Sequence, residues 1–304
     1  MKRSFLLLVI TILSPLIFHF SPLHAEISFS TGTFTFAGTM LPYRYADIHP
    51  ELTQDTAMLV LYLHGGTSRG TDNTAQLNEQ AVSVLYSYLQ AHGRKARLIV
   101  PQCPTTTSWD GKVKKPLYQL LRSMLQAEVA DSTRVYILGG SMGGTGTWKI
   151  INSYPELFAA AMPVAGNPTG CDAQMIAAIP VYTVMGLADD IMSVDPVVTF
   201  REQVIAAGGV MHLDTEAGWS HQNTCEMSYT AERLNWIFAQ RKGQPVIDPV
   251  ATTDIVITNN HQTPSPAAVK ILHNGQLYIQ CGNKRYTVTG KTCSGVESRW
   301  SLCR

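Results

Sequence analysis

A regular alternation of apolar runs and helical segments between residues 57 and 240 constrains the fold more than any other feature of this sequence. Each apolar run predicts a buried strand, and the segments between the runs repeat their apolar residues at helical spacing. The expected strands are 58–63, 97–100, 135–138, 159–164, 181–185 and 210–213. The expected helices are 75–89, 117–129, 144–151, 196–206 and 227–240. Such alternation is typical of the α/β class, in which helices cover both faces of a mostly parallel sheet.

The segment before this region has a different character. Residues 27–36 alternate with many serines and threonines, and residues 39–48 carry Tyr43 and Tyr45. This composition predicts an antiparallel pair of strands that opens the fold. We therefore expect one main domain over residues 26–242.

The segment after the main domain divides into two parts. Residues 243–268 hold four prolines and predict a linker. Residues 269–304 contain two turn signals, one at Asn274 and Gly275, which favour a short β-rich tail of three strands.

The first 25 residues have the pattern of a signal peptide. Lys2 and Arg3 come first, residues 5–18 are apolar, and the small residue Ala25 ends the segment. The alternative is a membrane anchor, which Pro15 disfavours because it interrupts the apolar stretch. We therefore expect an exported protein that is not stably inserted in a membrane after cleavage.

Net charge and cysteines limit the partners and the metal chemistry. Without Lys2 and Arg3, 21 basic residues face 22 acidic ones, so nucleic acid and anionic membranes are not expected partners. All six cysteines lie in the exported part, where disulfides can form. A bridge between Cys171 and Cys225 is one hypothesis, and two free buried thiols are the other. Zinc-type spacing is absent from the sequence, so no metal is expected.

A glycine-rich turn follows the expected strand 135–138. Residues 139–143, Gly-Gly-Ser-Met-Gly, fit the GxSxG pattern, in which a serine sits on a sharp strand-to-helix turn. Gly139 and Gly143 must be small so that this turn can close. The pattern predicts Ser141 as a nucleophile; the alternative is a loop that cradles phosphate or only packs.

A serine nucleophile needs a histidine base and a carboxylate, which in this arrangement follow the serine in the order acid, then histidine. Asp189 and Asp190 follow the expected strand 181–185, and we prefer Asp189 because it comes earlier in the loop. Asp190 stays an alternative, and Asp195 suits a helix N-cap better. The base is predicted to be His221, in the loop before the last helix.

The other histidines beyond Ser141 fit the base less well. His212 falls within an expected strand, and His261 and His273 fall in the linker and the tail. Elimination and chain order therefore favour the same residue, His221.

Backbone donors for an oxyanion are expected at two places. The N–H of Met142 starts the helix after the serine, and the N–H of Gly66 or Thr67 lies in the loop that begins with His64. We expect His64 to shape this loop rather than to titrate during a reaction.

Tryptophans are candidates for substrate contact. We expect Trp109 and Trp219 at the edge of a pocket, with Trp219 favoured because it lies two residues before His221, and Trp148 in the core.

Three segments carry a resemblance to a known family. "LHGGTSRGTDN" (63–73) is similar to the LHGxGxRGxDN segment of secreted bacterial esterases and predicted peptidases, a group related to phospholipase/carboxylesterases and polyhydroxybutyrate depolymerases. "VPQCP" (100–104) and "LNWIFAQRK" (234–242) also resemble segments of that group. The resemblance implies an alpha/beta-hydrolase fold over residues 57–242. The "TSRG" of this chain departs from it, since relatives often carry an acidic residue before the arginine.

The same resemblance implies site residues and an activity. It places Ser141, Asp189 and His221 in a triad, requires no cofactor, and implies a bacterial enzyme that is secreted, periplasmic or on the cell surface. The leading hypothesis is a serine esterase whose substrates are small or polysaccharide-linked esters, such as acetyl or feruloyl esters of plant polysaccharide. The alternatives are a serine peptidase on the same fold and a non-catalytic binding protein. The tail resembles short sorting segments of exported proteins, with a carbohydrate-binding appendage as the alternative.

Overall fold

The structure of the protein is a computed structural model, which describes residues 27–53 and 55–248 in full. It also describes the backbone of four strands further on. The chain divides into two compact units, Met1–Pro249 and Val250–Arg304. The predicted signal peptide and the greater part of the predicted linker lie outside the described residues. Within the described part, no helix has the length and apolar character needed to cross a membrane.

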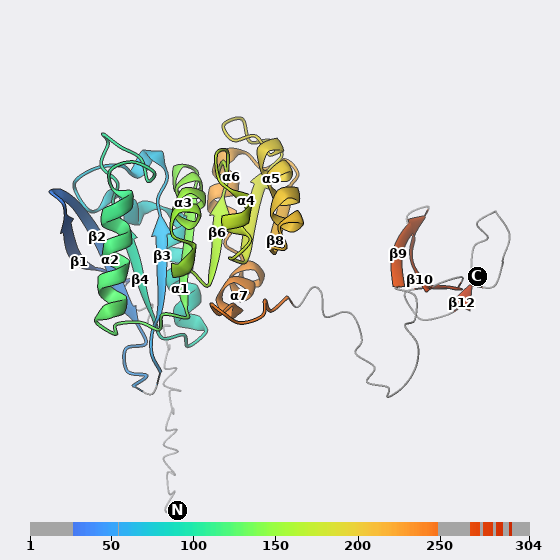
Figure 1. Cartoon of the computed structure of the whole chain (residues 1–304), viewed down its shortest axis with the longest axis horizontal. Coiled ribbons are helices and arrows are strands. Elements are labelled where there is room, and N and C mark those ends of the chain that lie inside the picture. The colour runs from blue at the N-terminus through green and yellow to red at the C-terminus, as the bar shows by residue number, and fades with distance from the viewer. Residues whose placement is uncertain are drawn as a thin grey trace, which may run out of the picture. The chain divides into compact units, whose positions relative to one another are not determined.

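The first unit is built on an eight-stranded sheet of order β1-β2-β4-β3-β5-β6-β7-β8 (Figure 1). The antiparallel part consists of β1 (Ser30–Phe36), β2 (Thr39–Ile48) and the pairing of β2 with β4. The parallel strands are β3 (Met58–Leu63), β4 (Ala96–Pro101), β5 (Val135–Gly140), β6 (Ala160–Val164), β7 (Val181–Gly186) and β8 (Met211–Glu216). The predicted mostly parallel sheet and its opening antiparallel pair are confirmed.

Helices cover both faces of this sheet (Figure 1). The longer ones are α1 (Gln80–Ala91), α2 (Lys114–Gln126), α3 (Met142–Ser153), α5 (Asp195–Ala206) and α7 (Ala231–Ala239). Shorter ones are α4 (Ala173–Ile176), α6 (His221–Met227) and the 3₁₀ turns η1 (Gly66–Ser68), η2 (Ala75–Asn78) and η3 (Pro155–Leu157).

The strands divide their side chains between two cores. Leu59 and Leu61 of β3 belong to one core, together with apolar residues of α2, α3 and α5. Val60 and Tyr62, on the opposite face of the same strand, belong to the other core, together with residues of α1 and α7. This alternation is what a strand buried on both faces requires. It gives the three layers that the sequence predicts.

The predicted helix over residues 227–240 corresponds to α7, which begins at Ala231, and a short helix that was not predicted, α6, precedes it. Ser220 caps α6, where its side chain accepts from the N–H of Asn223 in a reciprocal capping box. Thr230 caps α7 by accepting from the N–H of Arg233. Each cap starts a helix of its own. His221 therefore occupies the first position of α6 and not a loop, which corrects the prediction.

The second unit contains a small antiparallel sheet of order β12-β11-β10-β9. Its strands are β9 (Ala268–His273), β10 (Gln276–Cys281), β11 (Lys284–Thr287) and the two-residue β12 (Thr292–Cys293). The sequence predicts three of these strands, and β12 is an addition.

Close backbone packing surrounds the turn between β5 and α3. A Cβ added to Gly143 would lie 1.8 Å from the carbonyl oxygen of Leu63 in β3. One added to Gly139 would lie 2.5 Å from the carbonyl oxygen of Gly143. The requirement for small residues at these two positions is therefore a steric one, as the sequence predicts.

Replacing Gly143 by alanine tests this packing. Because the added Cβ would collide with the backbone of a buried strand, we expect Gly143→Ala to lower the free energy of unfolding by about 3 kcal/mol. Gly66→Ala is the matched control, since its Cβ would meet no atom within 4 Å. Urea unfolding of both variants measures the difference. Equal midpoints for the two variants would contradict the packing argument.

Candidate active site

Ser141 lies on a strained turn at the carboxyl end of β5. Its backbone has φ 59° and ψ −119°, and a positive φ is uncommon for a residue with a side chain. The turn is held on both sides, because the N–H of Ser141 donates to the carbonyl of Val164 (3.0 Å) and its carbonyl accepts from the N–H of Thr145 (2.9 Å). This is the geometry expected of a serine between a strand and a helix.

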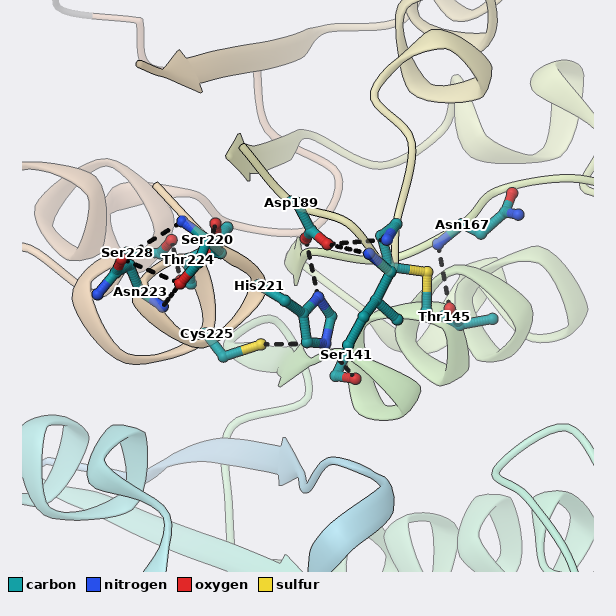
Figure 2. Close-up of polar contacts among 12 residues, drawn as sticks. Ser141, Thr145, Asn167, Asp189, Ser220, His221, Asn223, Thr224, Cys225 and Ser228 are labelled. Atoms are coloured by element: carbon teal, nitrogen blue, oxygen red, sulfur yellow. Dashed lines mark hydrogen bonds and ion pairs between the residues drawn. The ribbon is translucent and has the colours of Figure 1, made fainter. Parts of the chain in front are cut away.

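The structure brings the three predicted residues together in one chain of hydrogen bonds (Figure 2). The Nε2 atom of His221 lies 2.7 Å from Oγ of Ser141, and its Nδ1 lies 2.8 Å from Oδ2 of Asp189. When the Nδ1–H donates to the carboxylate, Nε2 is left free to accept the hydroxyl proton of Ser141. The arrangement can therefore make a serine hydroxyl nucleophilic.

Asp189 is the acid that the structure pairs with the histidine. Its side chain is fully buried, and its second oxygen accepts from the N–H groups of Ile191 (2.9 Å) and Met192 (2.8 Å). These bonds compensate for burial of the carboxylate and fix its orientation. Asp190 is exposed and Asp195 begins α5.

The predicted oxyanion donors lie around the same serine. Met142 is the first residue of α3, and backbone N–H groups in the first turn of a helix have no partner within the helix. Gly66 and Thr67 belong to η1 and line one cavity with Ser141 and His221. These backbone N–H groups are the candidates for hydrogen bonds to an oxyanion formed at the serine.

This cavity has a volume of about 870 Å³. It lies within the range of 300–1,000 Å³ that is common for ligand sites. Its wall is formed by η1 and the start of α1 on one side and by α6 on the other. The lining residues are Tyr62, Gly65, Gly66, Thr67, Ser68, Arg69, Asn78, Glu79, Gln80, Ala81, Gly140, Ser141, Ile191, His221, Gln222, Cys225 and Glu226.

His64 is a structural residue beneath η1. It is fully buried, its Nδ1 lies 2.7 Å from the carbonyl oxygen of Gly65, and its Nε2 accepts from the N–H of Cys103 (2.9 Å). Both bonds are satisfied only by a neutral ring that carries its proton on Nδ1. Burial lowers the pKa of His64 to about 4. The histidine shapes the loop, as the sequence predicts.

The prediction for Trp109 is wrong. This residue is fully buried, its ring lies against His64, and its Nε1–H donates to the carbonyl of His64 (3.0 Å). It supports the loop from within the core instead of touching a substrate. Trp219 is half-buried, packs against the core on the α1 side and is not part of the cavity wall. Trp148 lies in the core, as predicted.

The hypothesis of a bridge between Cys171 and Cys225 is also wrong. Both are free thiols, as is Cys103. Sγ of Cys225 lies 3.9 Å from Nε2 of His221 instead (Figure 2). Burial raises the pKa of Cys225 to about 12, so this thiol stays protonated at neutral pH.

Sequence reasoning missed Glu79. Its carboxylate lines the cavity and accepts hydrogen bonds from Tyr62, Gly65 and Ser68. In the sequence it looks like an acidic residue at the start of a helix, which is a common surface position. Its inward direction follows from tertiary packing alone. Among the described residues, no group of three or more His, Cys, Asp and Glu side chains is placed to hold a metal ion.

Comparison with known proteins identifies the fold family. The model of the prolyl oligopeptidase family matches residues 108–174, which include Ser141. A solved structure described as a thermostable esterase superposes with a TM-score of 0.64 at 29% identity, over 70% of this chain and 63% of that one. The chain has the alpha/beta-hydrolase fold.

The other proteins compared with this chain are less similar in sequence or match only a short segment. The poly(3-hydroxyalkanoate) depolymerase C of Paucimonas lemoignei is 37% identical over 60 residues, which span 20% of this chain and 14% of the depolymerase. A ferulic acid esterase structure has a TM-score of 0.57 at 14% identity, over 70% of this chain and 98% of that one. The acylaminoacyl peptidase of Pyrococcus horikoshii has a TM-score of 0.53 at 13% identity, over 74% of this chain and 43% of that one.

The buried His64 makes stability dependent on pH. The folded state resists protonation down to about pH 4, whereas an unfolded histidine binds a proton below about pH 6.5. The unfolded state therefore binds more protons in this window, and stability falls as the pH is lowered. We expect this residue to contribute about 2–3 kcal/mol to the loss of stability between pH 7 and pH 4.5.

Urea unfolding of the wild type and of His64→Gln at both pH values isolates this contribution. The variant should lose about 2–3 kcal/mol less than the wild type between the two conditions. Equal losses would show that His64 does not titrate in this way.

Proposed function

We propose that this alpha/beta-hydrolase is a serine hydrolase that cleaves carboxylic esters through an acyl-enzyme, with Ser141, His221 and Asp189 as the catalytic residues. The observation that carries the proposal is the continuous hydrogen-bond chain from Oγ of Ser141 through the imidazole to a fully buried carboxylate. The serine and the histidine line a cavity together with Gly66 and Thr67, the candidates for one of the two oxyanion donors.

The reaction follows from this geometry. Oγ of Ser141 attacks the ester carbonyl carbon as Nε2 of His221 takes the hydroxyl proton, and Asp189 stabilises the imidazolium that forms. The negative oxygen of the tetrahedral intermediate accepts hydrogen bonds from the N–H of Met142 and of Gly66 or Thr67. His221 then returns its proton to the leaving alcohol. A water molecule deprotonated by His221 attacks the acyl-enzyme, releases the acid and restores the serine.

The sequence identities to the solved structures favour an ester over a peptide as the substrate. The thermostable esterase is 29% identical to this chain, whereas the acylaminoacyl peptidase is 13% identical and shows only a shared fold. The depolymerase that matches 60 residues is named for a polyester. The same catalytic residues also cleave amides, so a serine peptidase is the second candidate, supported by the match to the prolyl oligopeptidase family.

The substrate we propose is an acetyl or feruloyl ester of plant polysaccharide. A cavity of about 870 Å³ can hold an aromatic acyl group. The signal-peptide pattern of the first 25 residues supports a secreted, periplasmic or cell-surface enzyme, which would meet polymeric substrates outside the cell. No cofactor takes part in this reaction.

Ser141→Ala tests the proposal. With the mature protein, we expect hydrolysis of p-nitrophenyl acetate, methyl ferulate or feruloylated arabinoxylan, and a fall in kcat of at least about 10⁴-fold in the variant because the nucleophile is lost. Asp189→Asn should lower kcat by about 10⁴-fold, since the carboxylate no longer orients the imidazole. Ser153→Ala is the matched control, because that serine lies at the other end of α3 and only bonds the carbonyl of Lys149.

Two outcomes would contradict the proposal. Ester hydrolysis that survives in Ser141→Ala would place the nucleophile elsewhere. Cleavage of peptide anilides without hydrolysis of any ester would favour the peptidase, while labelling of Ser141 by a fluorophosphonate would still report a live serine.

A further inference from the structure

Glu79 lies in the wall of the cavity, between η2 and α1, and the reaction described above does not use it. Its Oε1 atom accepts from the N–H of Gly65 (2.7 Å) and from Oγ of Ser68 (2.8 Å). Its Oε2 atom accepts from the hydroxyl of Tyr62 (2.7 Å). The bonds from Gly65 and Tyr62 have the length of hydrogen bonds to a charged acceptor, and the bond from Ser68 has ordinary hydrogen-bond length.

The two bonds of Oε1 reach both ends of one short turn. Gly65 is the N-cap of η1 and Ser68 is its last residue, so Gly66 and Thr67 lie between them. The backbone bond within the turn, from the N–H of Ser68 to the carbonyl of Gly65, is long, at 3.4 Å. The other side chains that bond the turn, those of His64, Arg69 and Gln102, each reach one of its carbonyl groups and do not join its two ends. A single oxygen atom therefore joins the two ends of the turn that carries Gly66 and Thr67, one of which is the candidate second oxyanion donor.

The third bond ties the carboxylate to the sheet. Tyr62 belongs to β3, is almost fully buried, and packs edge-on against the ring of Tyr229. Its hydroxyl is thus a fixed anchor. Through Glu79, the position of η1 is set by a central strand and by the start of α1.

Three donors to one carboxylate indicate that Glu79 is held as an acceptor. Burial raises the pKa of Glu79, and the three hydrogen bonds oppose that shift. With both oxygens occupied and no hydrogen bond to Ser141 or His221 among the described residues, the carboxylate is not placed to exchange protons with the nucleophile or the base. Its contacts are with the loop.

We propose that Glu79 is a positioning residue that clamps the turn Gly65–Ser68, so that the N–H of Gly66 or Thr67 is preorganised for the oxyanion. The inference rests on the proposed esterase function, and it adds a role for a residue outside the serine, histidine and aspartate. Preorganised donors stabilise a transition state more than a ground state, so their loosening lowers kcat while KM changes little.

Kinetics of Glu79→Ala, Glu79→Gln and Ser68→Ala test the clamp on the ester that the wild type hydrolyses fastest. Glu79→Ala should lower kcat by about 10–100-fold, with KM within about threefold. Glu79→Gln should keep kcat within about fivefold, since its amide oxygen can still accept from Gly65 and Ser68 while its amide nitrogen donates to the hydroxyl of Tyr62. Ser68→Ala, which removes one of the two loop bonds, should lower kcat by about 3–10-fold.

Tyr88→Phe is the matched control for a lost buried hydrogen bond. Its hydroxyl donates to Oδ1 of Asn235 at 2.5 Å, away from the cavity. This variant should lose stability without a change in kcat. A structural role for Glu79 alone would make Glu79→Ala behave in the same way.

Hydrogen exchange of residues 64–69, measured on the same variants, does not depend on ester hydrolysis. Exchange should become faster in Glu79→Ala and stay near the wild-type rate in Glu79→Gln and Tyr88→Phe. Glu79→Ala with unchanged exchange and kcat within threefold would overturn the clamp, as would a Glu79→Gln variant as slow as Glu79→Ala.

The two proposals fail in different ways. If the wild type hydrolyses no ester faster than Ser141→Ala, the proposed function fails, and exchange alone then decides whether the clamp exists. If Glu79→Ala does not fold, Ser68→Ala tests the clamp in its place, with Glu79→Gln as the variant expected to stay near the wild type. Unaltered kcat and exchange in Ser68→Ala would then overturn the clamp.

Discussion

The backbone of Ser141, held at a positive φ between β5 and α3, is the constraint on which the rest of the site depends. A residue with a side chain in this conformation costs about 1–3 kcal/mol, which the surrounding structure must offset. Gly139 and Gly143 permit the close packing that offsets this cost. Because they have no side chains, the start of α3 can lie against the carbonyl of Leu63. Buried cores on both faces of the sheet then hold strand and helix in place. As a result, the hydroxyl of Ser141 lies at the carboxyl edge of the sheet.

The parallel sheet supplies the remaining groups to that edge. His221 lies 80 residues from Ser141 in the chain and Asp189 lies 32 residues from His221, yet all three meet because each follows the end of a parallel strand. The loop after β3 brings the oxyanion turn to the same edge, and Glu79 links this turn to the strand before it. The chemistry of the site is therefore a consequence of topology, with each group delivered by a different strand.

Features of the fold and the site that depend on short sequence patterns could be predicted, and features that depend on distant partners could not. The strands, the glycines around Ser141 and the order of serine, acid and histidine are encoded in short patterns. The inward direction of Trp109 and Glu79 is not. Trp109 lies outside the expected helices and strands, Glu79 falls within the expected helix 75–89, and the orientation of both side chains depends on partners elsewhere in the chain. The absence of a bridge between Cys171 and Cys225 could not be predicted either, since the fold sets the distance between the two thiols. The start of α6 at His221 was encoded locally, in the capping pair Ser220 and Asn223, and prediction missed it.

The central claim is that Ser141 is the nucleophile and that backbone donors flank it. A crystal structure of the mature protein after reaction with a fluorophosphonate tests both parts at once. We expect a phosphorus atom bonded to Oγ of Ser141, with its phosphoryl oxygen at about 2.7–3.1 Å from the backbone nitrogens of Met142 and of Gly66 or Thr67. A phosphorus on another residue, or a phosphoryl oxygen that faces solvent without these contacts, would contradict the account.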